Sequence, residues 1–162
     1  MKFSATMDRT TKVVTILLIG ALLIIPLSIL IVRKEGESFG PVVMPVIMLI
    51  VLGVIVEYRV LYYQITDEEV IIRRSAGNAV IKRSEIKSIN MIESDQLRKS
   101  IRTFGVGGLF GYFGSFYNRR LGAMTWYLTR RDKLVLITTA TGKKIVISPD
   151  DPEGLVAAVK LT

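Results

Sequence analysis

Two long runs of uncharged residues constrain this chain more than any other feature of its sequence. The first run covers residues 13–32 and the second covers residues 39–56, with a polar turn at residues 33–40 between them. A helix of about 20 apolar residues spans the ~30 Å hydrocarbon core of a bilayer. The first run is too long for the apolar part of a secretory signal peptide, and no small-residue cleavage site follows it. We therefore predict two retained transmembrane helices that form a hairpin.

The distribution of lysine and arginine predicts the orientation of this hairpin. Three basic residues precede the first run, two lie in the connecting turn, and seventeen of the 22 follow the second run. Because cytoplasmic segments carry the excess of Lys and Arg, we expect both termini in the cytoplasm. The predicted organisation is a cytoplasmic N-terminal tail (1–12), a two-helix transmembrane hairpin (13–56) and a cytoplasmic domain (57–162).

The domain after the hairpin alternates apolar and polar residues in the way that is typical of β-strands. Predicted strands lie at residues 58–66, 69–74, 79–83, 86–92, 124–130, 133–139 and 143–148, and short polar turns separate several of them. Near the C-terminus, Asp150 or Asp151 is a suitable N-cap and Pro152 suits a first helical turn. We predict a mainly-β domain of about seven antiparallel strands, connected as a meander, with one C-terminal helix packed on it.

The composition removes most of the usual catalytic groups. The chain has no cysteine and no histidine, which excludes disulfides, thiol chemistry, Cys/His zinc sites and histidine-activated nucleophiles. The carboxylates Asp150, Asp151 and Glu153 cluster where a helix start explains them. The two uncharged runs hold no ionisable side chain for an ion pathway. We expect no enzymatic activity, no cofactor and no bound metal.

One stretch, TFGVGGLFGYFGSFYNRR at residues 103–120, concentrates glycine and aromatic residues. It contains five of the 13 glycines, and eight of the chain's aromatic residues lie between Phe104 and Tyr127. It does not match a phosphate-binding loop, because no Gly-Lys-Ser/Thr follows, and the dinucleotide fingerprint fails at Phe110.

Two interpretations of this stretch remain open. It is either a long connection between the fourth and fifth strands, whose rings complete the core, or an exposed interaction surface. The candidates for such a surface are the rings of Phe110, Tyr112, Phe113 and Phe116, with Arg119 and Arg120 as a charged border.

The same part of the chain carries most of the surplus positive charge. Residues 98–133 contain eight basic residues and one acid, against 22 and 14 in the whole chain. Such a run is ordinarily a solvated face, but beside an anionic leaflet each Lys or Arg contributes ~1 kcal/mol to binding. The candidates for contact with lipid headgroups are Arg98, Lys99, Arg102, Arg130, Arg131 and Lys133. Nucleic-acid binding, the other use of basic residues beside aromatics, is not expected in a membrane-tethered chain.

Several stretches resemble bacterial pleckstrin-homology (PH) domains. YYQITDEEVIIRR and SEIKSIN resemble the opening strands, and GYFGSFYNRRLGAMTWYLT resembles the middle, with Gly111–Phe116 as its most specific part. The resemblance covers residues 57–160. It implies seven strands, a C-terminal helix and a bacterial membrane location, but no reaction. PH domains of eukaryotes bind phosphoinositides through a basic loop between the first two strands. The loop here, residues 67–69, is acidic, so we do not expect that site.

These features predict a non-catalytic, membrane-anchored adaptor or scaffold. It would present a PH-like domain for protein interaction or self-association at the cytoplasmic face of the bacterial plasma membrane. The expected partner is a second copy of the chain or another membrane protein. The alternative is a module that binds anionic lipid headgroups through the basic region 98–133.

Overall fold

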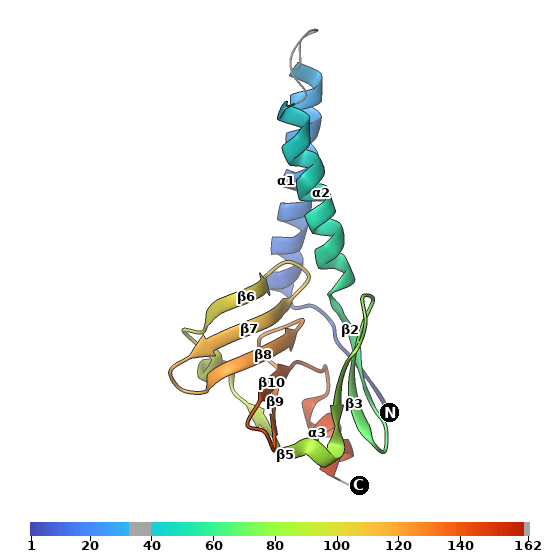
Figure 1. Cartoon of the computed structure of the whole chain (residues 1–162), viewed down its shortest axis with the longest axis vertical. Coiled ribbons are helices and arrows are strands. Elements are labelled where there is room, and N and C mark those ends of the chain that lie inside the picture. Colours follow the sequence, from blue (N-terminus) through green and yellow to red (C-terminus); the bar gives the residue numbers. More distant parts are fainter. Residues whose placement is uncertain (33–39, 161–162) are drawn as a thin grey trace.

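In the computed structural model, which describes residues 1–32 and 40–160, two long helices project together from one end of a β-rich domain (Figure 1). Helix α1 (Arg9–Val32) and helix α2 (Gly40–Glu57) lie side by side. Asp8 directly precedes helix α1, and its carboxylate accepts a hydrogen bond from the backbone N–H of Thr11 at 2.7 Å, as an N-cap residue does. The predicted polar turn falls largely at residues 33–39, which lie outside the described residues.

The helices differ in how clearly their described parts could cross a membrane. Residues 9–29 of α1 are long and apolar enough to do so, whereas the apolar segment Pro45–Glu57 of α2 is shorter. Many large apolar side chains of both helices are exposed, among them Leu17, Ile24, Ile50 and Val54. One possible span is therefore established by length and composition, and the two-span hairpin remains a prediction.

The domain contains two sheets and a C-terminal helix. The first sheet has the order β1–β2–β3–β4, formed by β1 (Lys2–Ser4), β2 (Val60–Ile65), β3 (Glu69–Arg74) and β4 (Ala79–Lys82). The second has the order β5–β9–β10–β8–β7–β6, formed by β5 (Ile86–Ile92), β9 (Leu134–Thr139), β10 (Lys144–Ile147), β8 (Gly122–Leu128), β7 (Tyr112–Asn118) and β6 (Ile101–Gly107). Two short 3-10 helices, Arg83–Glu85 and Ser94–Leu97, flank β5, and helix α3 (Pro152–Lys160) ends the described chain.

Two apolar clusters form the core of the domain. One joins the first sheet to the second sheet and α3, and its fully buried members include Tyr63, Ile72 and Leu155. The other joins β7 and β8 to the segment after β5, and it contains Leu97, Trp126 and Leu128. Helix α3 begins as predicted, because Asp151 accepts a hydrogen bond from the Gly154 N–H at 2.9 Å.

The seven predicted strands are all present, but their predicted meander is wrong. Strand β10 lies between β8 and β9 and pairs with β8 in parallel, with Val146 opposite Trp126. Val146 and Ile147 are both fully buried, although successive side chains of a strand point to opposite faces. A strand that is covered on both faces is stable in the centre of a sheet rather than at its edge.

The stretch at residues 103–120 is a β-hairpin, so the predicted long connection is also wrong. Strands β6 and β7 pair, and Gly105 lies opposite Gly114. Both glycines have positive φ, at 115° and 120°, and a Cβ atom on either would collide with the backbone of the facing strand. The glycines therefore allow two strands to approach closely where side chains would not fit.

The segment before α1 contributes a strand to the first sheet. Strand β1 pairs with β2, with Phe3 opposite Tyr63. Because β2 follows α2 in the chain, this pairing places the start of α1 and the end of α2 together, where the helices join the domain (Figure 1).

Candidate functional site

The aromatic residues of β7 that were expected to face outward are mostly used inside the molecule. Phe113 and Phe116 are only 7% and 5% exposed, so the prediction that their rings point outward is wrong. The Phe116 ring stacks on Trp126, with 3.9 Å between centroids and 8° between planes. Phe116 lies opposite Met124 on β8, and all three side chains belong to the second apolar cluster.

Phe110 and Tyr112, which frame the end of the β6–β7 hairpin, are half-buried. The backbone N–H of Phe110 donates a hydrogen bond to the Thr15 hydroxyl of α1 at 3.0 Å. The guanidinium of Arg59 lies 6.0 Å from the centre of the Phe110 ring. The end of the hairpin therefore packs against the base of the helices.

Three other apolar side chains form the exposed surface that the sequence analysis missed. Phe104 is 78% exposed, Ile101 67% and Tyr117 47%. Ile101 lies opposite Tyr117, and after a bulge Phe104 lies opposite Ser115. Because Ser115 and Tyr117 are two residues apart on β7, the three apolar side chains share one face of the sheet. Alternation along β7 from a buried Phe116 is the signal that would have placed Tyr117 outward.

Four cations gather at the same end of these strands, around a cavity of about 400 Å³. Arg98 and Lys99 come from the segment between β5 and β6, and Arg119 and Arg120 come from the turn between β7 and β8. Asp95 is the carboxylate of this cavity, and it lies 3.6 Å from Arg98 and 3.8 Å from Arg120. The structure thus brings Arg98 and Lys99, predicted to contact lipid headgroups, to the same cavity as Arg119 and Arg120, predicted to border a protein interface.

The buried side chain of Asn118 connects the two segments that carry these cations. Its amide nitrogen donates hydrogen bonds to the Gln96 carbonyl and the Ser100 hydroxyl, both at 2.9 Å. Its amide oxygen accepts one from the Leu121 N–H at 2.7 Å. A buried amide with its partners satisfied in this way holds the backbone of both segments in one arrangement.

The remaining predicted headgroup residues lie elsewhere, and most make contacts within the domain. Arg130 bonds to Asp132 at 2.6 Å and to Asp150 at 3.0 Å. The Arg131 guanidinium lies 5.3 Å from the centre of the Tyr112 ring, and the Lys133 ammonium donates to the Asp150 carbonyl. Arg102 is exposed on β6, next to the bulge.

The Arg130 cluster lowers the pKa values of its two carboxylates. Hydrogen bonding to Arg130 is the main cause that holds the pKa of Asp132 below its usual value. Burial acts to raise the pKa of Asp150, but hydrogen bonds from Thr6 and Arg130 outweigh it and leave that pKa below its usual value as well. Both carboxylates therefore stay ionised at neutral pH and serve as partners of Arg130.

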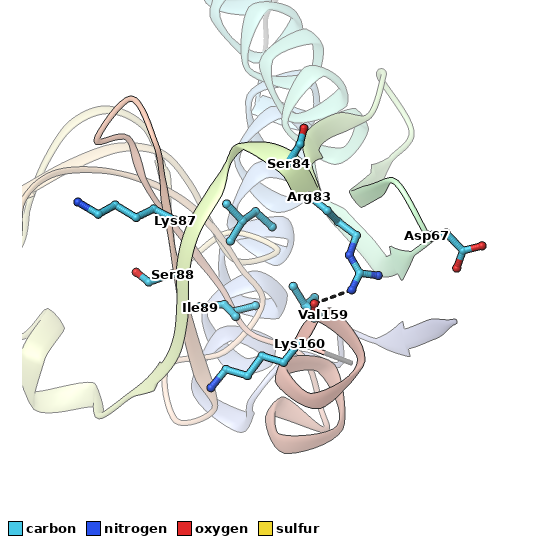
Figure 2. Close-up of a pocket in the computed structure, with 9 residues that line it drawn as sticks. Asp67, Arg83, Ser84, Lys87, Ser88, Ile89, Val159 and Lys160 are labelled. Carbon is cyan, nitrogen blue, oxygen red and sulfur yellow. Dashed lines mark hydrogen bonds between the residues drawn. The ribbon is translucent and has the colours of Figure 1, made fainter. Parts of the chain in front are cut away.

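A second cavity, of about 430 Å³, lies between the 3-10 helix Arg83–Glu85, β5 and α3 and includes Asp67 of the β2–β3 turn (Figure 2). Its Arg83 side chain donates hydrogen bonds to the Ala158 carbonyl at 3.1 Å and to the Val159 carbonyl. Arg83 thus caps the C-terminal end of α3, where free carbonyls favour a cation. A neighbouring cavity, which shares Asp67 with this one, is lined by Asp67, Glu68 and Glu69 at the β2–β3 turn. The turn therefore presents three carboxylates at the surface.

Within residues 1–32 and 40–160, no group of three or more Asp and Glu side chains could hold a metal ion. Tyr63 is fully buried, and burial raises its pKa to about 12. Its hydroxyl donates to the Tyr127 carbonyl at 2.7 Å and accepts from the Ser148 N–H at 3.0 Å. This phenol is a structural link between the two sheets.

Comparison with known proteins agrees with this architecture. A family model described as Bacterial PH domain matches residues 61–161, which is more than half of the chain. Searches of curated proteins and of solved structures give no match. The matched residues begin in β2 and run through α3, so β1 and both long helices lie outside them. The chain therefore belongs to the bacterial PH domain family.

Proposed function

We propose that this chain is a non-catalytic adaptor of the bacterial plasma membrane. In this proposal a two-helix hairpin crosses the membrane, both termini lie in the cytoplasm, and the PH domain is held at the cytoplasmic face. There it recruits a partner protein or a second copy of the chain.

The pairing of β1 with β2 is the observation that carries this proposal. The two strands flank the helices in the chain, and Ser4 lies opposite Tyr62 across them. Chain segments that are paired in one sheet must lie on one side of a membrane, so an even number of spans fits and a single span does not. The exposed apolar side chains of α2, such as Ile50 and Val54, also suit lipid better than water.

Contacts between the helices and the domain support its role as a fixed platform. The Phe110–Thr15 hydrogen bond joins the β6–β7 hairpin to α1. Just before α1 in the chain, Thr6 bonds to Asp150 through its hydroxyl at 2.6 Å. An adaptor that is held at two points presents its surfaces at a constant height above the membrane.

The non-catalytic part of the proposal rests on the roles of the acidic groups. Asp151 caps α3, and Asp132 and Asp150 pair with Arg130. Asp95 lies between two arginines. General acid–base catalysis needs a carboxyl group that is free to exchange a proton near neutral pH, and these carboxylates are engaged in structural contacts.

Labelling of single introduced cysteines tests the topology, because the chain has no cysteine of its own. We expect a membrane-impermeant maleimide to label Ser38→Cys in intact spheroplasts and to label Glu68→Cys only after lysis. Labelling of Glu68→Cys in intact spheroplasts would place the domain outside the cytoplasm and contradict the proposal.

Crosslinking in intact membranes tests the adaptor role. We expect a discrete adduct with a second copy or with one other protein, at expression levels close to the natural one. If the chain forms no adduct at any expression level, while a known membrane dimer in the same sample is captured, the adaptor role is contradicted. The proposed topology would be unaffected by that result.

A further inference from the structure

We propose that the PH domain makes its own contact with the anionic leaflet that holds the helices, and this inference rests on the proposed membrane anchor. The contact uses a docking surface that consists of Ile101, Phe104, Tyr117, Arg98, Lys99, Arg119 and Arg120. The proposed partner of this docking surface is the lipid headgroup layer.

The position of β6 brings this surface to the membrane. Figure 1 shows β6 as the strand of the second sheet nearest the helices, level with the first turns of α1. The hairpin that β6 forms with β7 is joined to α1 at Thr15, which is the third residue of the uncharged run that begins at Val13. Seven strand residues extend roughly 20 Å, so β6 leads from this junction outward to Ile101.

The chemistry of the docking surface suits a headgroup layer. An exposed aromatic ring and an exposed Ile side chain can enter the boundary between headgroups and acyl chains, where amphipathic and apolar groups are favoured. Four cations surround Asp95, the carboxylate of the cavity, and Lys and Arg near an anionic leaflet add to the attraction. The outer edge of β6 has no neighbouring strand within the described residues, so its backbone groups are free to bond to headgroups.

Position favours lipid over a protein partner. Protein interfaces also accept aromatic and arginine side chains, so the choice of lipid rests on where the surface lies. The other end of the same hairpin is bonded to α1 at Thr15, which holds the hairpin beside the proposed anchor. Ile101 and Tyr117 line the cavity of the four cations, so apolar and basic groups would meet the leaflet together.

The acidic β2–β3 turn lies at the opposite end of the domain. Strand β2 starts three residues after α2 ends and runs away from the helices (Figure 1). Asp67 and Glu68 therefore lie far from the bilayer, and the docking surface is a separate site from the loop that eukaryotic PH domains use.

Depth-dependent quenching in the full chain tests the inference. The chain is reconstituted in nanodiscs of phosphatidylcholine with or without phosphatidylglycerol, and one introduced cysteine carries an environment-sensitive fluorophore. Ser115→Cys reports on the docking surface without removing any member of it, because Ser115 is exposed opposite Phe104. Ile24→Cys reports on the anchor, and Glu68→Cys is the distal control.

We expect lipids that carry a spin label near the headgroup to quench the Ser115→Cys probe when phosphatidylglycerol is present and to leave the Glu68→Cys probe unaffected. Acyl-chain spin labels should quench the Ile24→Cys probe in both lipid compositions. An unquenched Ile24→Cys probe would overturn the anchor proposal. A quenched Ile24→Cys probe with an unquenched Ser115→Cys probe would overturn only the docking inference. Shielding of Ser115→Cys that grows with the number of copies per disc, without lipid quenching, would assign the surface to a second copy and overturn it too.

Charge variants measure the contribution of the cations. Each cation near the leaflet contributes ~1 kcal/mol, so Arg119→Gln/Arg120→Gln should weaken the docking equilibrium on the order of 30-fold. The matched control, Lys82→Gln/Lys87→Gln, removes two exposed cations outside the surface and should leave quenching unchanged. Equal losses in both variants would indicate a general charge effect and contradict a defined docking surface.

Discussion

At the scale of single residues, the aromatic side chains of β6 and β7 divide into two kinds. Phe116 fills the second apolar cluster against Trp126, whereas Phe104, on the neighbouring strand, is largely exposed. The two rings are similar in chemistry and differ only in which face of the sheet they occupy. Truncation should therefore cost far more stability at Phe116 than at Phe104.

Truncation of the buried ring should destabilise the domain. Phe116→Ala should lower the free energy of unfolding by about 3–5 kcal/mol, because it opens a cavity beside Trp126. Phe104→Ala is the matched control and should change stability by less than about 0.5 kcal/mol, as substitutions at exposed positions usually do. Chemical denaturation of the full chain in detergent, followed through Trp126 fluorescence, measures both. Equal effects would contradict the assigned faces.

A Cβ atom at Gly114 should disrupt the β6–β7 hairpin. Gly114 has a positive φ, and the added atom would meet the Phe104 carbonyl. At Gly77, which has a φ of 80° but open space around it, Ala costs only the backbone strain of about 1–2 kcal/mol. We expect Gly114→Ala to speed amide exchange across β6 and β7, and Gly77→Ala to leave exchange there unchanged. Amide exchange across β6 and β7 that stays as slow in Gly114→Ala as in the wild type would show that the two strands tolerate the added Cβ atom.

At the scale of elements, β1 is a short strand that is held to the domain by polar contacts beyond its ladder. The Asp150 N–H donates to the Ser4 carbonyl at 2.9 Å, and the Asp150 carboxylate bonds to Thr6 and Arg130. This carboxylate joins the segment before α1 to the start of α3, so its charge state should control how firmly β1 is attached.

Acidification should therefore release β1 before the domain unfolds. The pKa of Asp150 is lower in the folded chain than the unfolded value of about 3.9. Its stabilising contribution is present above that value and is lost as the pH falls through the folded pKa. We expect the protection factors of the amides at residues 2–6 to fall below about pH 4 in the wild type, and Asp150→Asn to show lower protection already at neutral pH. An unchanged profile in Asp150→Asn would assign the attachment to the strand ladder alone.

At the scale of the whole molecule, the domain and the helices meet at a small polar junction. Thr11 and Thr15 are buried on the first turns of α1, and Thr15 accepts the hydrogen bond from Phe110. In the proposed membrane arrangement, this junction sets the angle between the domain and the helix axis, and with it the height of β6 above the bilayer.

Removal of the Thr15 hydroxyl should loosen this angle. Thr15→Val keeps the shape of the side chain but removes the hydrogen-bond partner of the half-buried Phe110 N–H, at a cost of about 1 kcal/mol. Thr10→Val changes an exposed residue one turn earlier and is the control. Distances between spin labels at Ile24→Cys and Glu68→Cys should broaden in Thr15→Val and stay narrow in Thr10→Val. Identical distributions would mean that the strand pairing alone holds the domain in place.

The sequence by itself determined the local elements of this protein. Periodicity and the two uncharged runs located α1, α2, α3 and seven of the strands, because apolar spacing and cap residues act over a few positions of the chain. The lack of cysteine and histidine also excluded whole classes of chemistry without any structure.

Only the tertiary structure decided which elements meet and which faces they cover. Period-two alternation shows that Phe116 and Tyr117 point to opposite faces, but the core position of Trp126 determines which of them is buried. The place of β10 between β8 and β9 and the pairing of β1 with β2 depend on contacts between residues far apart in the chain. The docking surface has the same origin, because Arg98 and Arg119 are separated by a whole hairpin and meet only when β6 and β7 pair.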